Sequence, residues 1–545
     1  MKHTDIIQKL NLEQKCALLS GETVFTTRAL PGKGIPAITL SDGPNGVRKQ
    51  AGAADHLGLN PSVPATCFPT SSATACSWDE KLGEAVGEAL GEEAAAQEVA
   101  VLLGPGLNIQ RSPLCGRDFE YFSEDPILAG RMAAAYVRGI QKNGIAACPK
   151  HFAVNSQELR RMASDSVLDE RTLRELYLTG FEIVVKEAKP KTIMTSYNLI
   201  NGTYANENAH LLQDILRKDW DFDGAVVTDW GGSNDHALGV KNGSTLEMPC
   251  PGGDSIRELM KAVQGGKISE ADVDARLDEM LELVLSTHAA VEKAPRTFDA
   301  AAHHKLARRA AAESIVLLRN EGGILPLKPN EKLAVIGDFA ETPRYQGAGS
   351  SAVNALQVDT LLESIKADDS GITLVGYASG FERQGAADAE KLEEAVALAK
   401  KADTVLLCLG LDELRESEGL DRSDMKLAEN QQQLLAAVAA VNPNVVVLLS
   451  AGAPVETPWV GQCRALVYGA LGGQAGAGAA ADILTGKLCP CGKLSQTWAQ
   501  AQTTPPPRRT SAARAGTWST ARACMWATGT IRPPVCRWRS PSATA

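Results

Sequence analysis

A carboxylate at the end of an apolar strand is the feature of this sequence best suited to chemistry. Residues 224–227 form an apolar run that ends in Asp229 and Trp230, followed by two glycines. A strand buried on both faces would hold the Asp229 carboxylate at the rim of a sheet, where barrel enzymes place their reactive groups. The alternative is that Asp229 caps the next helix, and this motif alone leaves both interpretations open.

Four earlier apolar runs also end in polar residues, and helical patterns such as 127–142 and 169–188 separate them. This alternation from about residue 35 to 290 predicts a parallel α/β fold, a (β/α)8-like TIM-type barrel. The strand ends of such a barrel meet at one mouth, which would bring together Asp42, Lys150, His151, Tyr197 and Asp229.

A second alternation predicts an open α/β sheet with helices on both faces, an α/β sandwich. Its strands are expected at 333–336, 372–375, 404–409, 445–449 and 465–468, with helices at 388–401 and 426–441. We therefore expect a catalytic barrel at 1–290, a linker at 291–330, the sandwich at 331–498 and an aberrant segment at 499–545.

Residues 499–545 break the pattern of the rest of the chain. They are rich in arginine and proline, contain isolated tryptophans, and have no aspartate, glutamate or lysine. A natural basic tail is one interpretation. We favour a change of reading frame, because shifted codons permit residues 535–545 to spell V-P-V-A-F-P-F-G-Y-G. As written, the segment is expected to be a disordered tail.

Charge and cysteine usage exclude several classes of protein. A net charge of −10 argues against nucleic acid or an anionic membrane as a partner. The first ten residues lack the apolar stretch of a signal peptide, and no run reaches membrane length. The scattered cysteines show no metal-ligand spacing, so we expect a reduced, cytoplasmic protein without metal or organic cofactor.

Several stretches together resemble glycoside hydrolase family 3, the β-glucosidase and β-xylosidase group, in order and spacing from about residue 10 to 498. The frame-shifted spelling is similar to what the family carries before its fibronectin-like third domain, a domain that the resemblance implies is absent here. The stretches are SDGPNGVR at 41–48, NIQRSPLCGR at 108–117, SEDP at 123–126, KHFAVN at 150–155, MTSYN at 194–198, VTDWG at 227–231 and ESEGLDR at 416–422.

The resemblance implies two catalytic carboxyl groups. Cleavage with retention needs a carboxylate nucleophile and a carboxylic acid about 5–5.5 Å apart. By resemblance Asp229 is the nucleophile and Glu418 the acid, with Glu416 as the alternative acid. Asp229 should stay ionised, its pKa held low by Lys150 or arginines. The acid should lie in a less polar setting that raises its pKa.

Seven further residues would bind the sugar, if the resemblance holds at each position. Charged side chains can bind several hydroxyls at once, and Trp230 would stack on an apolar sugar face. Each also has a packing alternative; Arg117, for example, can pair with Glu120, and Arg160 can be mistaken for Arg161. The seven are Asp42, Arg117, Lys150, His151, Arg161, Tyr197 and Trp230.

The expected substrate is a small β-glycoside from which a terminal β-D-glucose is released. A β-xylosidase is the nearest alternative, and self-association into a homo-oligomer is left open. A Schiff-base aldolase using Lys150 and an inactive or sugar-binding remnant are the competing functions. The loop at 150–157 lacks the second histidine of a KHFPGHG-type motif, which argues against the N-acetylglucosaminidase branch of the family.

Overall fold

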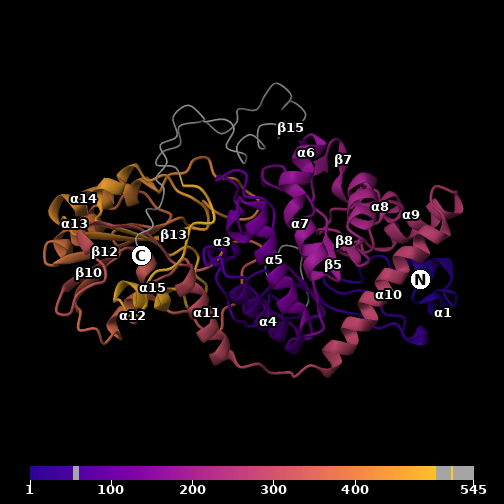
Figure 1. Cartoon of the computed structure of the whole chain (residues 1–545), viewed down its shortest axis with the longest axis horizontal. Coiled ribbons are helices and arrows are strands. Elements are labelled where there is room, and N and C mark those ends of the chain that lie inside the picture. Colours follow the sequence, from indigo (N-terminus) through magenta and orange to yellow (C-terminus); the bar gives the residue numbers. More distant parts are fainter. Residues whose placement is uncertain (53–59, 499–516, 520–545) are drawn as a thin grey trace.

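Two lobes make up the molecule, a computed structural model that describes residues 1–52 and 60–498 and the backbone of 517–519 (Figure 1). We call residues 1–293 the first lobe and residues 300–492 the second lobe. The extended segment 294–299 joins them, and Figure 1 shows it between the long helix α10 (Glu270–Lys293) and α11 (Ala300–Ser314). Each lobe has its own cluster of buried apolar side chains.

Short parallel strands form a ring in the first lobe. The strands β1 (Leu40–Asp42), β2 (Val101–Leu103) and β3 (Ala146–Ala147) pair in that order, and β5 (Thr192–Met194) pairs with β8 (Ala225–Val227). Single bridges continue the ring between Phe152 and Thr195, Val227 and Leu246, and Ser20 and Glu247. Residues 25–26 then pair with 39–40 in antiparallel orientation and close the ring.

The ring confirms the TIM-like layout that the sequence predicts. Strands β2, β5 and β8 are buried throughout, as expected for parallel strands covered on both faces. The sequence did not predict that residues 20–26 and 246 belong to the ring, because an isolated bridge needs no run of apolar or β-branched residues.

Helices surround this ring. Along the chain, helices alternate with the strands and pack around the outside of the ring, among them the neighbouring pair α4 and α5. The remaining strands, β4 (Asp165–Val167), β6 (Leu199–Ile200) and β7 (Thr203–Tyr204), form a small separate sheet. The helices are α1 (Thr4–Ile7), α2 (Leu12–Ala17), α3 (Ser71–Ala75), α4 (Glu80–Ala96), α5 (Pro126–Gln141), α6 (Glu170–Thr172), η3 (Leu173–Leu178), α7 (Thr179–Ile183), η4 (Val184–Ala188), η6 (His210–Asp219), α8 (His236–Asn242), α9 (Gly253–Gln264) and α10.

The SEDP stretch at 123–126 starts helix α5 and has no direct place in the chemistry. The Asp125 carboxylate accepts hydrogen bonds from the amides of Ile127 and Leu128, and Pro126 occupies the first turn. Both residue types are favoured there, because the carboxylate satisfies free amides and proline lacks one.

A six-stranded sheet forms the second lobe, in the order β11-β10-β12-β13-β14-β9. All neighbours are parallel except β9, which runs antiparallel to β14. Four of the five predicted strands are confirmed to within one residue, and the fifth, β11, extends three residues beyond its predicted end. Their bounds, with those of the helices, are β9 (Val316–Asn320), β10 (Lys332–Ile336), β11 (Thr373–Ala378), β12 (Thr404–Gly410), β13 (Val445–Ser450), β14 (Ala465–Tyr468), α11, α12 (Leu361–Lys366), α13 (Ala389–Ala399), α14 (Glu429–Val441) and α15 (Gly476–Leu484).

The segment expected as a linker, 291–330, is only partly a connection. It contains α11, which packs against α15, and β9, which is an edge strand of the second sheet. The apolar residues Val316 and Leu317 pair with the β14 residues Tyr468 and Val467. This part of the chain therefore adds to the second core, and the extended connection is limited to 294–299.

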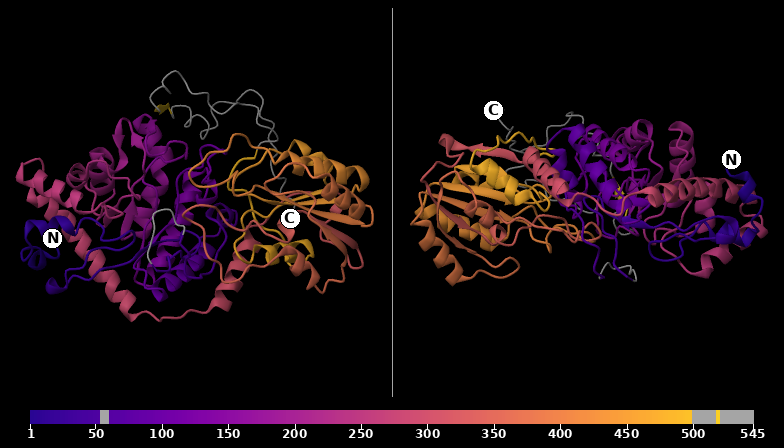
Figure 2. Two further views of the ribbon diagram at one scale, coloured as in Figure 1. Left: turned by 180° about the vertical axis from the view of Figure 1, so that it is seen from behind. Right: turned by 90° about the horizontal axis from the view of Figure 1, so that it is seen from below.

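After α15 the chain returns to the first lobe as a strap, residues 493–497. The amide of Lys493 donates to the carbonyl of Cys76 at 2.7 Å. The hydroxyl of Ser123 donates to the carbonyl of Ser495 at 2.6 Å. The two lobes are thus connected by the chain at 294–299 and again at this strap, and Figure 2 shows them side by side in both views.

Most of the segment 499–545 lies outside the described residues, and the prediction of a disordered tail with it. Its described part is the strand β15 (Thr517–Ser519), which pairs in parallel with β4. Among the helices of the described residues, none has the length and apolar character required to cross a membrane.

Candidate active site

Asp229 lies two residues beyond the end of β8 and is 8% exposed. Its Oδ1 accepts a hydrogen bond from the amide of Trp230 at 2.8 Å. Its Oδ2 receives no hydrogen bond from the described residues and lies 3.6 Å from Nε2 of His151. One carboxylate oxygen is therefore fixed by the backbone while the other faces the site.

Glu418 reaches the same site from the second lobe. It lies on the irregular loop between β12 and α14, and its side chain is 16% exposed. Its Oε1 lies 2.8 Å from Nη1 of Arg161 and 3.7 Å from Nη1 of Arg117, both in the first lobe. Its Oε2 accepts a hydrogen bond from the amide of Ser350 at 2.7 Å.

Arg161 and Tyr197 connect the surroundings of the two carboxylates. The guanidinium of Arg161 lies 4.9 Å from the centre of the Tyr197 ring, within the range of a cation–π contact. The hydroxyl of Tyr197 donates to the carbonyl of Trp230 at 3.0 Å, beside Asp229. A continuous chain of contacts therefore runs from Glu418 to the end of β8.

The protonation of the two carboxyl groups differs from the expectation. Burial raises the pKa of Asp229, and the charges of Arg117, Arg161 and Lys150 offset only part of that effect. Burial would also raise the pKa of Glu418, but the guanidinium groups of Arg117 and Arg161 outweigh it and the pKa is lowered. The reason is geometric. Arg161 and Arg117 pair directly with Glu418, whereas they act on Asp229 only through their charge.

Lys150 and Arg117 share a buried carboxylate that the sequence interpretation gave only a packing role. Arg117 donates to both oxygens of Glu120, at 2.8 and 2.9 Å, and Nζ of Lys150 lies 3.3 Å from Oε1 of Glu120. The packing alternative for Arg117 is therefore real, yet Arg117 also contacts His151 and Glu418. Glu120 orients two cations toward the mouth of the ring.

The charge of Lys150 is stabilised in this environment. Burial would favour the neutral amine, but the carboxylates of Glu120 and Asp42 outweigh it and raise the pKa of Lys150. A Schiff-base lysine needs the opposite shift, because only the neutral amine attacks a carbonyl. The structure thus disfavours the aldolase.

His151 and Asp42 complete the polar wall of the site. Burial, together with the positive charges of Arg117 and Lys150, lowers the pKa of His151 well below its usual range, so its ring is neutral. Burial raises the pKa of Asp42 to about 6, despite the nearby charge of Lys150. Asp42 ends β1, as the strand-end argument predicts.

Trp230 gives the site its aromatic side. Its indole N–H donates to the carbonyl of Val24 at 2.8 Å, and its ring lies 5.2 Å from that of Phe25. The side chain is half-buried, so the ring is fixed on one side while part of its surface stays accessible.

The structure decides between the two members of each pair that the sequence left ambiguous. Arg161 points into the site, whereas Arg160 is exposed. Glu416 is fully buried within the second lobe, where it accepts a hydrogen bond from the amide of Gly452 at 3.0 Å. All nine residues expected in the site, including Glu418, therefore gather around one mouth, and Glu416 does not.

Three features were missed by the sequence interpretation. Glu158 accepts hydrogen bonds from Arg161 at 2.6 Å and from the amide of Gly419 at 2.9 Å. Asp421 and the glycine-rich loop 347–351 support Glu418. Glycines at 347 and 349 were a usable signal for the loop. Glu158 gave none, because a buried carboxylate on a loop cannot be distinguished from a solvated one in sequence. Asp421 lay in the 416–422 stretch, but no role was assigned to it.

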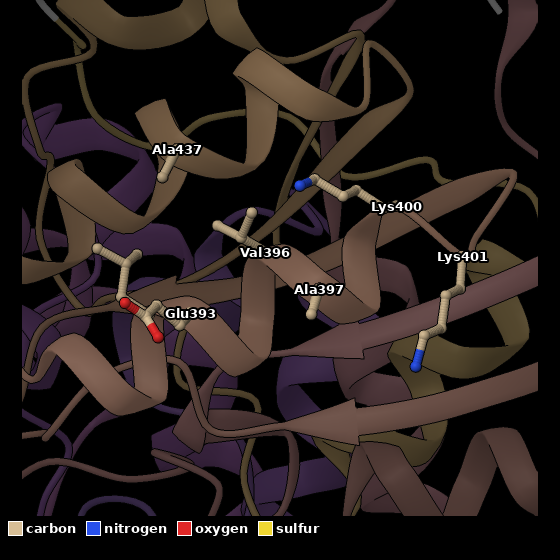
Figure 3. Close-up of a pocket in the computed structure, with 7 residues that line it drawn as sticks. Glu393, Val396, Ala397, Lys400, Lys401 and Ala437 are labelled. Atoms are coloured by element: carbon tan, nitrogen blue, oxygen red, sulfur yellow. The ribbon is translucent and has the colours of Figure 1, made fainter.

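Other parts of the described chain offer less. The His, Cys, Asp and Glu side chains of the described residues form no group placed to hold a metal ion. A hollow of about 560 Å³ opens between α13 and α14 (Figure 3). It lacks paired carboxylates and lies apart from the nine residues above; its lining is Leu392, Glu393, Val396, Ala397, Lys400, Lys401 and Ala437.

Comparison with known proteins agrees with this two-lobe site. Residues 49–283 match the family model of the glycosyl hydrolase family 3 N terminal domain, and residues 315–527 match that of the glycosyl hydrolase family 3 C-terminal domain. A crystal structure of a Bifidobacterium adolescentis GH3 beta-glucosidase superposes with a TM-score of 0.85 at 42% identity, covering 91% of this chain and 71% of that one.

Two curated relatives add information on activity. A thermostable beta-glucosidase B of Acetivibrio thermocellus is 46% identical over 497 residues, which cover 90% of this chain and 65% of that protein. An exo-alpha-(1->6)-L-arabinopyranosidase of Bifidobacterium longum is 44% identical over 507 residues, covering 90% and 66%. The chain thus spans slightly less than two thirds of the length of these relatives.

Proposed function

The chain belongs to glycosyl hydrolase family 3, and from this premise we propose that it is a retaining glycosidase that releases terminal non-reducing β-D-glucose from small glycosides. Asp229 is the nucleophile and Glu418 the acid. The observation that carries the proposal is that Arg117 and Arg161 contact the second-lobe Glu418 and also act on the charge of the first-lobe Asp229. Two carboxylates from different lobes therefore face one cluster of cations.

The reaction has two displacement steps. Oδ2 of Asp229, the oxygen without a hydrogen bond, forms a bond to the anomeric carbon while Glu418 gives its proton to the departing oxygen. Glu418, now a carboxylate, then takes a proton from water, and the water oxygen displaces Asp229. The configuration at the anomeric carbon is inverted twice and therefore retained.

The lowered pKa of Glu418 suits the second step, which needs a carboxylate as base. For the first step the proton must be held on Glu418. We propose that sugar hydroxyls compete for the hydrogen bonds of Arg161 and Arg117, which weakens their hold on Glu418 and raises its pKa. Substrate binding thus raises the pKa of Glu418. The pKa of Asp229, which is raised in the free protein, falls in the same step because Arg117 and Arg161 turn toward the anomeric carbon.

The remaining residues recognise the sugar. Asp42, Lys150 and His151 form the polar wall of the mouth and suit the hydroxyls, while Arg117 and Arg161 supply forks of N–H donors. The half-buried ring of Trp230 suits an apolar sugar face. This arrangement supports a pyranose held between a polar wall and an aromatic surface.

A pentopyranoside is the second candidate substrate. The relative named as an arabinopyranosidase is nearly as similar to this chain as the β-glucosidase, and a β-xyloside remains the alternative from the sequence. Both pentoses lack the sixth carbon of glucose, and arabinopyranose also has the opposite configuration at C4, so one assay decides among the three sugars.

The decisive experiment compares 4-nitrophenyl β-glucoside, β-xyloside, α-L-arabinopyranoside and α-glucoside as substrates of the wild type and of Asp229→Asn. We expect turnover of β-glucoside that is lost in the variant without loss of folding. Proton NMR should show the β-anomer as first product. Binding of glucose without turnover of any substrate would instead support an inactive, sugar-binding remnant.

We further propose that residues 1–290 form the catalytic barrel domain and that the sandwich domain begins near α11 and not at 331. The core contacts of α11 and β9 support this boundary. A cytoplasmic location is part of the same proposal, supported by the free, mostly buried thiols among the described cysteines.

A further inference from the structure

Glu418 lies on a loop without helix or strand, yet it must be held accurately. Residues 411–428 connect β12 to α14 and have no regular structure. Misplacement of a catalytic group by about 1 Å can cost on the order of 100-fold in rate. Something outside the loop must therefore fix its position against the first lobe.

Asp421, three residues after Glu418, makes the most extensive of these contacts. Its Oδ1 accepts hydrogen bonds from the amides of Glu158 at 2.9 Å and Gly116 at 3.3 Å, and its Oδ2 accepts from the amide of Leu159 at 2.9 Å. One carboxylate thus binds two separate loops of the first lobe. Hydrogen bonds to an ionised acceptor are stronger than neutral ones.

Gly116 provides the surface on which the loop rests. A Cβ atom at this position would lie 1.8 Å from the carbonyl oxygen of Leu420 and 2.3 Å from that of Ser417. Both oxygens belong to the second-lobe loop, on either side of Glu418. Any side chain at 116 would therefore push the loop away from the mouth of the ring.

A third contact sets the loop against Arg161. Oε2 of Glu158 accepts hydrogen bonds from the amide of Gly419 and from Nη1 of Arg161, and that same Nη1 contacts Glu418. The backbone of the acid loop and the cation beside its carboxylate are thus held by one side chain.

We propose that Asp421 and Gly116 are positioning residues for Glu418, and that proton transfer to the leaving group depends on this contact between the lobes. The inference rests on the proposed function, because it assigns a consequence to the placement of the acid. Asp421 does not face the sugar; it acts through the loop that carries Glu418.

A displaced acid has a specific kinetic signature. A poor leaving group such as methoxide needs the proton, whereas 2,4-dinitrophenolate departs without it. General acid catalysis contributes roughly 100- to 10,000-fold, so partial displacement should cost methyl β-glucoside about 10- to 100-fold in kcat/KM. The kcat/KM for 2,4-dinitrophenyl β-glucoside should fall by less than about threefold, since its glycosidic bond breaks with little proton transfer.

The test uses Asp421→Asn and Gly116→Ala in the full chain. Asp421→Asn keeps the shape but turns one acceptor into a donor facing backbone amides. Asp424→Asn is its control, because Asp424 lies on the same loop and accepts from the amide of Lys426. Gly32→Ala is the control for Gly116→Ala, because a Cβ there meets no atom within 4 Å.

Both test variants should show the leaving-group dependence above, while both controls match the wild type. The second step also uses Glu418, as the base, so kcat for the dinitrophenyl glucoside should fall in both test variants. Azide needs no base and should restore that kcat by forming a glycosyl azide. Equal loss with every leaving group, an unchanged rate, or failure of both variants to fold would overturn the proposal. A wild type inactive on all β-glycosides would instead overturn the proposed function.

Discussion

Nη1 of Arg161 lies between two carboxylates, 2.8 Å from Oε1 of Glu418 and 2.6 Å from Oε2 of Glu158. Glu418 belongs to the second lobe and the other two residues to the first. One guanidinium therefore controls both the place and the charge of the proposed acid, and the chemistry is tied to the contact between the lobes.

Removal of this cation should change the pH dependence of catalysis. Arg161→Met removes a charge that lowers the pKa of Glu418, so that pKa should rise. The acid must be protonated to act, and in the substrate complex proposed above it is the group of higher pKa. The basic limb of the kcat profile for methyl β-glucoside should therefore move to higher pH. Arg160→Met, at the exposed neighbour, should leave the limb in place. A basic limb that stays fixed in Arg161→Met would contradict the assigned ion pair.

The nucleophile can be tested by chemical rescue. Asp229→Gly should lower kcat on 2,4-dinitrophenyl β-glucoside by more than about 1,000-fold, because covalent catalysis is lost. Azide or formate in the emptied space should restore part of the rate and give the α-configured product. Hydrolysis at the wild-type rate without added anion would exclude Asp229 as the nucleophile.

Two glutamates two residues apart should respond differently to the same change. Glu418→Gln should lower methyl β-glucoside turnover about 100-fold or more, since the acid is lost. Glu416→Gln alters a fully buried group bonded to Gly452, so it should reduce the melting temperature and leave the leaving-group dependence unchanged. The reverse pattern would move the acid to Glu416.

Glu158 should make stability depend on pH. Burial raises the pKa of Glu158 to about 7 in the folded state, above the ordinary value near 4.5. Between these values the folded state binds more protons than the unfolded one, so the contribution of Glu158 to stability falls as pH rises. The difference in melting temperature between wild type and Glu158→Gln should therefore decrease from pH 4.5 to 7. A difference that grows over this range would show that Glu158 is ionised throughout.

The second sheet should be sensitive to cavities. Leu407 lies in β12, which is buried along its whole length and leads directly to the acid loop. Leu407→Ala should lower the free energy of unfolding by about 2–5 kcal/mol, because a buried side chain is removed without collapse of the space. Chemical denaturation measures the loss, and a change below about 1 kcal/mol would mean that the sheet repacks.

The strands were predictable because their residues are apolar throughout. Runs such as those of β8 and β12 can only be buried, and the polar residue that follows each run must then lie at a sheet edge. This reasoning alone brought Asp229, Asp42 and Lys150 to one mouth. The contribution of Glu418 required the family resemblance, because a carboxylate on a loop carries no periodic signal.

Protonation was the part that sequence reasoning misjudged. The expectation placed arginines beside the nucleophile, whereas the structure places Arg161 and Arg117 against Glu418. Which carboxylate an arginine touches depends on side-chain distances of a few ångströms between lobes. No pattern within either lobe records those distances, and the role of Gly116 was hidden for the same reason.

The strap at 493–497 has a consequence for how a sugar comes and goes. If the segment 294–299 were the single connection, it could act as a hinge about which the two lobes separate. The return of the chain to Cys76 and Ser123 ties them at a further point, so swinging open would strip these hydrogen bonds on every turnover. Sugar entry and product release are therefore expected to depend on local shifts of side chains around the mouth, and not on separation of the lobes.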